Sequence, residues 1–256
     1  MDLEIIVSRE AHLIAELYDL FHAFGDVKNP IYLLYHGESS KLLYYGSLIE
    51  EKGLWDEVFR SIIGLSTSNQ VCGIIEALRG INVYKWDEIK ERLNKHGVEL
   101  VRVYRDRRDK IREMIGRILG IEKFFNKIYV ILAYNPLRGL IGSLPYYDDK
   151  KGYAIIDLFI GPGVTPEKTL DLAIHELLHG LIRINELDIP DEIEEEFIDT
   201  LCPEGYLSRE LGLSEELNIE ESRLAVIIGK YFDEKHYMVG TLVDYLKKYY
   251  NGNYLL

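Results

Sequence analysis

The chain has 256 residues, of which 47% are hydrophobic and 29% are charged, and its formal net charge is −13. This balance is typical of a folded chain and excludes wholesale disorder. The acidic charge argues against nucleic acid as the main partner, because phosphate binding needs a basic face. The start, MDLEIIVSRE, lacks the features of a signal peptide, and no apolar run approaches the roughly 20 residues of a membrane span. With only two cysteines and no disulfide framework, we expect a cytoplasmic protein that does not bind membranes.

Residues 1–120 are expected to be mainly helical, and they contain no motif that names a function. Ser8 is a good N-cap, and apolar residues recur after it at helical spacing. Glycines interrupt the apolar pattern over 31–84, and Gly97 is interpreted as a helix stop. The expected elements are a strand at 3–7, a helix at 8–24, helical pieces over 31–84, and helices at 86–97 and 105–120.

The pattern changes after residue 120. A β-branched apolar run predicts a strand, and two further apolar runs that flank DDKKG at 148–152 predict a hairpin. Thr165 as N-cap and Pro166 at the first helical position mark the start of a long helix. The expected elements are strands at 127–136 and 152–161 and helices at 166–184, 191–202, 214–232 and 236–250.

These elements predict an α+β fold that is mostly helical, with a small mixed or antiparallel sheet packed on the 166–184 helix. Residues 1–120 and 121–256 form either two regions or one continuous domain.

The sequence AIHELLHG contains His175-Glu176-Leu177-Leu178-His179. In a helix, His175 and His179 stand one turn apart on the same face, so two neutral imidazoles can reach one metal ion. Glu176 lies on the neighbouring surface, where it can act as general base on a metal-bound water. A short pattern of this kind also occurs by chance, so its surroundings decide. This helix is apolar nearly all round and is expected to be buried, and zinc would satisfy polar side chains that are otherwise costly to bury.

The chain over 127–202 resembles the gluzincin metallopeptidases, the thermolysin-like clan. In that family a downstream helix brings a glutamate as the third zinc ligand, and an aspartate four positions later hydrogen-bonds the first histidine. The matching positions in DEIEEEFIDTL are Glu195 and Asp199. The resemblance implies a zinc site of His175, His179 and Glu195, with Asp199 orienting His175.

The third ligand could also be one of the neighbouring glutamates at 192, 194 and 196. Glu195 is favoured because Ile198, Asp199 and Cys202 share its helical face. An acidic run on a helix is usually a solvated face, and we apply that interpretation to the other three glutamates.

The family also has an edge strand that pairs with extended peptides, and the corresponding segment here is GYAIIDLFIG at 152–161. The alternative is that this apolar segment is a central strand. A donor for the developing oxyanion is expected as well. His236 is the first candidate for this catalytic role, and the other candidates are Tyr146, Tyr147, Tyr231 and Tyr237.

The sequence therefore predicts a zinc metallopeptidase that acts on peptide or protein substrates, with Glu176 as general base. The alternative is a non-catalytic zinc-binding or interaction protein with a structural metal. That alternative predicts a fourth protein ligand, for which Asp157 and His236 are the candidates. The basic residues between 102 and 117 alternate with acidic ones and are interpreted as a solvated helix face.

Overall fold

The computed structural model describes residues 1–22, 39–66, 68–135 and 139–249. Three predicted boundaries lie outside these residues: the end of the first helix at 24, the end of the strand at 136 and the end of the last helix at 250. So does the beginning of the predicted helical pieces over 31–84.

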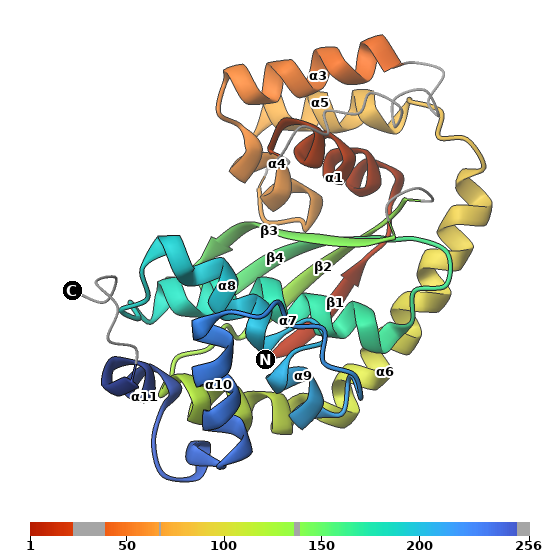
Figure 1. The fold of residues 1–256 in the computed structure, drawn as a ribbon. Coiled ribbons are helices and arrows are strands. Elements are labelled where there is room, and N and C mark those ends of the chain that lie inside the picture. The colour runs from red at the N-terminus through yellow and green to blue at the C-terminus, as the bar shows by residue number, and fades with distance from the viewer. Residues whose placement is uncertain (23–38, 67, 136–138, 250–256) are drawn as a thin grey trace.

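One mixed sheet of four strands forms the centre of the molecule, in the order β1-β2-β4-β3 (Figure 1). β1, β2 and β4 run parallel, and β3 pairs antiparallel with β4 through the predicted hairpin. The strands are β1 (Asp2–Ile6), β2 (Lys127–Tyr134), β3 (Leu140–Asp148) and β4 (Tyr153–Ile160).

The prediction that 152–161 is the edge strand is wrong. β4 lies between β2 and β3, and all eight of its residues are buried. Such continuous burial explains its unbroken apolar run, because a central strand with both faces covered needs no polar alternation. β3, all of whose residues are partly exposed, is the edge strand next to β4, and β1 is the edge strand on the other side of the sheet.

Helices cover one face of the sheet with a first apolar core. They are α1 (Arg9–His22), α3 (Ser39–Glu51), α4 (Trp55–Ile62) and α5 (Asn69–Arg79), drawn above the sheet in Figure 1. Alternate residues of the strands, such as Ile131 and Ile155, point into this core. We call this side the α1 face.

The other face carries a second core, which we call the α7 face. Ile156 and Leu158 of β4 point into it. Its elements are α6 (Trp86–Leu119), α7 (Pro166–Ile184), α8 (Asp191–Leu201), α9 (Tyr206–Leu211), α10 (Arg223–Asp233), the short 3₁₀ helix η1 (His236–Met238) and α11 (Leu242–Tyr249). Since β1 pairs with β2 and α6 packs in the same core as α7, parts of the predicted N-terminal region belong to the same sheet and core as the C-terminal region.

The predicted helix stop at Gly97 is wrong, because α6 continues through it from 86 to 119. A Cβ at this position would lie 2.9 Å from Cγ2 of Ile5. Glycine is thus needed for the close approach of α6 to β1, and not to end the helix.

The predicted tail helices are too long. Residues 214–222 form no helix, and the acidic residues there are largely exposed, so the segment has no apolar face to bury. The last predicted helix is divided into η1 and α11, and Thr241 begins α11 by accepting a hydrogen bond from the backbone N–H of Asp244. The described part of the chain contains no helix that is both long and apolar enough to cross a bilayer.

Candidate metal centre

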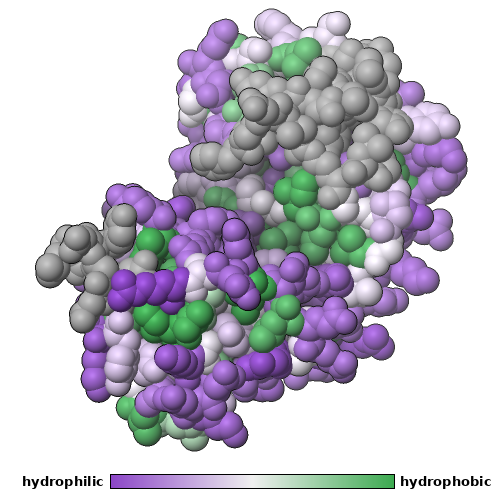
Figure 2. Space-filling model, in the orientation of Figure 1, coloured by the Kyte–Doolittle hydropathy of each residue, from purple (hydrophilic) through white to green (hydrophobic). Residues whose placement is uncertain are grey.

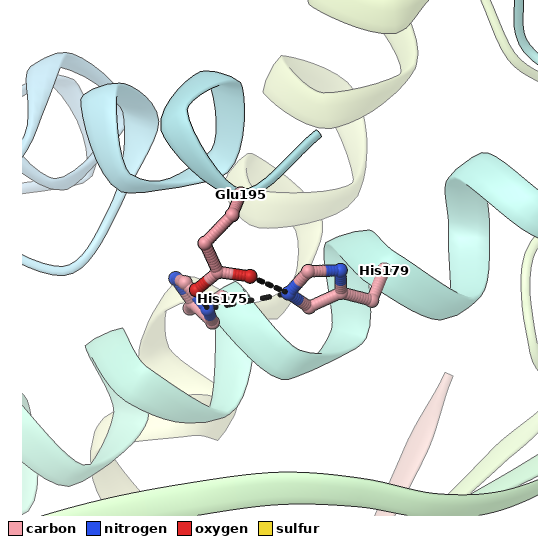
Figure 3. A group of neighbouring side chains, drawn as sticks. All are labelled: His175, His179 and Glu195. Atoms are coloured by element: carbon pink, nitrogen blue, oxygen red, sulfur yellow. Dashed lines mark hydrogen bonds and ion pairs between the residues drawn. The ribbon is translucent and has the colours of Figure 1, made fainter. Parts of the chain in front are cut away.

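Two histidines of α7 and one glutamate of α8 converge on one point (Figure 3). The Nε2 atoms of His175 and His179 are 3.3 Å apart. The Glu195 carboxylate places Oε1 3.4 Å from Nε2 of His175 and Oε2 3.3 Å from Nε2 of His179. α7 spans the predicted residues, with Thr165 as N-cap, so the two histidines stand one turn apart.

The spacing of these donors fits a tetrahedral metal ion. Ligands at about 2.0–2.1 Å from a tetrahedral zinc ion stand about 3.3–3.4 Å from one another. The separation of the two Nε2 atoms matches this value, and the Glu195 carboxylate approaches each of them through a different oxygen at 3.3–3.4 Å. The donor set of two imidazoles and one carboxylate suits zinc. Among the described residues, these three form the group of histidine, cysteine and acidic side chains able to share one ion.

The outward nitrogens of both imidazoles are held by acceptors. Nδ1 of His175 donates to the carbonyl oxygen of Cys202 at 2.9 Å, and Nδ1 of His179 donates to Oε1 of Glu194 at 2.5 Å. A carbonyl and a carboxylate can only accept, so each Nδ1 carries the proton and each Nε2 offers a lone pair. This is how groups behind metal-binding histidines fix the tautomer and the orientation of the ring.

Asp199 lies near His175, as the resemblance implies, but it is not the closest partner. Its Oδ1 atom is 3.5 Å from Nδ1 of His175, whereas the Cys202 carbonyl is at 2.9 Å. The aspartate is also more than half exposed. The main anchor of this ring is therefore the backbone at the end of α8.

The prediction that Glu194 lies on a solvated face is wrong. Glu194 is 7% exposed, and it also lies 3.5 Å from Nη2 of Arg183. The exposed positions of Glu192 and Glu196 agree with the solvated interpretation. One signal could have revealed Glu194: at helical spacing it shares the buried stripe of Phe197, Ile198 and Leu201.

Asp171, one turn before His175, is a second residue that sequence reasoning missed. It is 1% exposed, and it accepts hydrogen bonds from the backbone N–H of Glu204 at 2.7 Å and from Oγ of Ser208 at 2.5 Å. These bonds fix the chain just beyond Cys202. The carbonyl that holds His175 is thereby positioned from the same helix that carries the histidine.

The charges in the cluster favour a positive charge at the two imidazoles. Burial alone would lower the pKa of His175, but hydrogen bonding to Glu195, the charge of Glu176 and the Cys202 carbonyl outweigh it and raise the pKa to about 9. The two imidazoles hold the pKa of the Glu195 carboxyl well below its usual range. Protons on the imidazoles or a metal cation can supply this positive charge, and a metal binds by displacing the protons.

Glu176 lies beside the cluster in a cleft of about 660 Å³. It is 7% exposed, and burial raises the pKa of its carboxyl. On the β3 side, a Cβ at Gly142 would lie 3.2 Å from Cγ of Glu176, so the glycine leaves the room that this side chain occupies. A buried carboxylate with a raised pKa, next to a metal site, suits proton transfer near neutral pH.

The cleft runs between elements of both faces. The α1 face contributes Tyr18, Asp19 and His22 to the cleft. The opposite wall includes the candidate metal ligands and Arg183. Figure 2 shows the surface indented between the upper helices and α8. The strands contribute Ile141, Gly142, Ser143 and Leu144 of β3, and Asp157 and Phe159 of β4.

The residues proposed as oxyanion donors do not line this cleft. His236 lies in η1, about a third exposed, and its Nε2 is 2.7 Å from a carboxylate oxygen of Glu234. Tyr231 donates to the carbonyl of Gly240, and Tyr237 to Glu210. The other two candidates, Tyr146 and Tyr147, lie further along β3, outside the cleft lining. The structure thus brings together Glu176, the three metal-site residues and Asp199, but not His236.

Comparison of the chain with protein-family models, with curated proteins and with solved structures found no match.

Proposed function

We propose that this protein is a zinc metallopeptidase of the zincin type, with zinc bound by His175, His179 and Glu195. The observation that carries the proposal is the convergence of two imidazole Nε2 atoms, 3.3 Å apart, with a carboxylate whose two oxygens lie 3.3–3.4 Å from them, and with Glu176 beside them in the same cleft. A bound zinc ion would acidify a water molecule and polarise the scissile carbonyl.

In this proposal the chain's own residues move the proton and hold the substrate. Glu176 accepts the proton of the attacking water and passes it to the leaving amine. β3, as the edge strand lining the cleft, offers backbone groups that can pair with an extended peptide. Such pairing accepts many sequences, so peptides and unfolded protein segments are the proposed substrates.

The positions of the candidate fourth ligands favour an open, catalytic site over a closed structural one. Asp157 binds Ser143, and His236 pairs with Glu234. Within the described residues no fourth side chain joins the cluster, which leaves a coordination position for water or substrate.

Glu176→Gln is the experiment that tests the catalytic role. The variant should keep about one zinc ion per chain, because Glu176 is not a ligand, while hydrolysis of an unfolded protein such as reduced casein falls by roughly 100- to 10,000-fold. Elemental analysis and a fluorescent peptide-release assay give the two readouts. Glu192→Gln, an exposed acid on α8, is the matched control and should change neither.

Glu195→Gln tests the metal site. Elemental analysis should find clearly less zinc than the roughly one ion per chain expected for wild type.

Hydrolysis by Glu176→Gln at the wild-type rate would contradict the assigned general base. Absence of zinc from reconstituted wild-type protein would contradict the whole proposal.

A further inference from the structure

Asp157 is a buried acid for which the proposed reaction has no use. It is 1% exposed and lies in the middle of β4, where its neighbours on both sides belong to the apolar cores. Burial of a carboxyl group in such surroundings is costly unless partners or a function compensate for it. Asp157 also lines the cleft that contains the metal cluster.

The pleat of the sheet places Asp157 and Glu176 on opposite faces. Ile155 and Phe159 belong to the core of the α1 face, so Asp157, which alternates with them, points the same way. Its partner on β3 is Ser143, whereas the preceding residue, Gly142, packs against Glu176 on the α7 face. The cleft therefore passes around the edge of β3, with the candidate metal ligands on the α7 face of the sheet and Asp157 on the α1 face.

Two hydrogen bonds hold the carboxyl group of Asp157. Oδ1 accepts a hydrogen bond from Oγ of Ser143, and the backbone N–H of Asp157 itself donates to the carboxyl group. Tyr18 lines the cleft opposite, and burial, followed by the negative charge of Asp157, raises the pKa of its hydroxyl to about 12. The Tyr18 ring is fixed by His22, stacked at 4.3 Å, and by Trp55 and Phe59, each at 5.2 Å between ring centroids.

We propose that Asp157, with Tyr18 and Ser143 beside it, forms a subsite for a positively charged substrate side chain, lysine or arginine, next to the scissile bond. This inference rests on the proposed peptidase function. A peptide paired with the edge of β3 presents successive side chains to opposite faces of the sheet. When the backbone of one substrate residue lies at the His175–His179–Glu195 group, the side chain of the next substrate residue points toward Asp157.

The charges around the subsite select a cation. Burial is the main cause that raises the pKa of Asp157 to about 8, and the negative charges of Glu176 and Asp19 add to it. These like charges approach Asp157 from two sides, from α7 and from α1. A guanidinium or ammonium group placed between them offsets the repulsion, whereas a neutral or acidic side chain does not.

Two other charged side chains of the cleft already have partners. Arg183, its one lysine or arginine among the described residues, lies 3.5 Å from Glu194 behind His179. Glu195 faces the imidazoles. Asp157 is the acid of the cleft that lies on the α1 face of the sheet and is held by a side chain of the edge strand β3.

Binding of matched peptides to zinc-loaded Glu176→Gln protein tests the subsite without turnover. The probes are a short alanine-rich peptide with one arginine and the same peptide with citrulline, which has nearly the same shape but no charge. Fluorescence anisotropy should give at least about tenfold tighter binding of the arginine peptide, as expected for a charged pair at about 1.4 kcal/mol. Calorimetry at pH 7 in two buffers should find close to one proton released on binding, because the cation converts Asp157 to its carboxylate.

Asp157→Asn, placed in the same Glu176→Gln protein, should remove both the preference for arginine and the proton release. Asp109→Asn, which neutralises an acid that is 93% exposed on α6, is the matched control and should keep both. Ser143→Ala provides a second variant if Asp157→Asn fails to fold, and it should weaken the preference.

The outcomes separate this inference from the proposed function. Preferential binding of the arginine peptide without hydrolysis by wild-type protein would support the subsite and overturn the peptidase. Hydrolysis of both peptides at equal rates, with equal affinities, would support the peptidase and overturn the subsite. Binding of neither peptide, or a preference that survives in Asp157→Asn, would also overturn the subsite.

Discussion

Each face of the sheet packs against a helix in which a histidine has a polar side chain one turn later, and the two arrangements differ. On the α1 face, His12 has Glu16 one turn later, and Nδ1 of His12 accepts the backbone N–H of Tyr134 at 3.3 Å while Nε2 lies 3.4 Å from Glu16. On the α7 face, Nδ1 of His175 and Nδ1 of His179 are each hydrogen-bonded, and the two Nε2 atoms lie 3.3 Å apart and share one carboxylate, that of Glu195. A buried histidine is therefore a metal-ligand candidate when a second imidazole and a carboxylate converge on its ring nitrogen, and not when, within the described residues, that nitrogen meets one carboxylate alone.

The same substitution at each histidine site should give opposite results. His179→Leu should lose the zinc and keep the fold, since leucine fits a buried apolar helix. His12→Leu should keep the zinc and lower the free energy of unfolding by about 1–3 kcal/mol, because the N–H of Tyr134 loses its acceptor. Elemental analysis and urea denaturation measure the two effects. If both variants kept zinc, or if both lost it, the comparison between the faces would not hold.

Asp157 should make the stability of the protein depend on pH. Burial raises its folded-state pKa to about 8, whereas the unfolded-state value is about 3.9. Between these values the folded state binds more protons than the unfolded state, so the free energy of unfolding falls as the pH rises from about 4 to about 8. The loss between pH 5 and 8 is at most about 4 kcal/mol.

Asp157→Asn should remove this part of the pH dependence. Urea denaturation at pH 5, 6, 7 and 8 compares the two proteins, with Asp109→Asn as a control that retains the wild-type slope. Equal slopes for wild type and Asp157→Asn would show that the carboxyl is already ionised at pH 5.

Glu194 should affect zinc affinity through His179. Glu194→Gln keeps the size of the side chain but weakens the acceptor at Nδ1, so the dissociation constant for zinc should rise by about 10- to 100-fold. Competition with a fluorescent chelator measures it. Glu196→Gln, two positions along and exposed, should leave the affinity unchanged; an equal effect in both variants would indicate a general effect of charge on α8.

The smallest expected effect concerns Gly142, which leaves space for the side chain of Glu176. A Cβ at Gly142 would lie 2.8 Å from Cδ2 of Leu158 as well as near Glu176, so Gly142→Ala should destabilise the protein by about 1–3 kcal/mol and slow hydrolysis with zinc retained. Gly73→Ala, in α5 with no atom near the added Cβ, should instead stabilise it by about 0.5–1 kcal/mol. Thermal denaturation and the peptide-release assay compare the two variants.

The sequence by itself determined the local features: the bounds of α7 from its N-cap, the hairpin from DDKKG, and the placement of two histidines on one helical face. These depend on residues within a few positions of one another, for which capping and periodicity are sufficient evidence. The choice of Glu195 came from the resemblance to the gluzincins, supported by the helical face that it shares with Ile198 and Asp199, and Glu195 lies with the two histidines in the structure.

Only the tertiary structure decided the features that depend on contacts between distant segments. An apolar run such as 153–160 suits either an edge or a centre, and the pairing of β2 and β3 on its two sides made it central. Gly97 ends no helix, because β1 lies against it. Asp171 and the Cys202 carbonyl became part of the site because α7, α8 and the chain after them pack together. The spacing within α8 could indicate that Glu194 is buried, but only this packing decided that it binds His179.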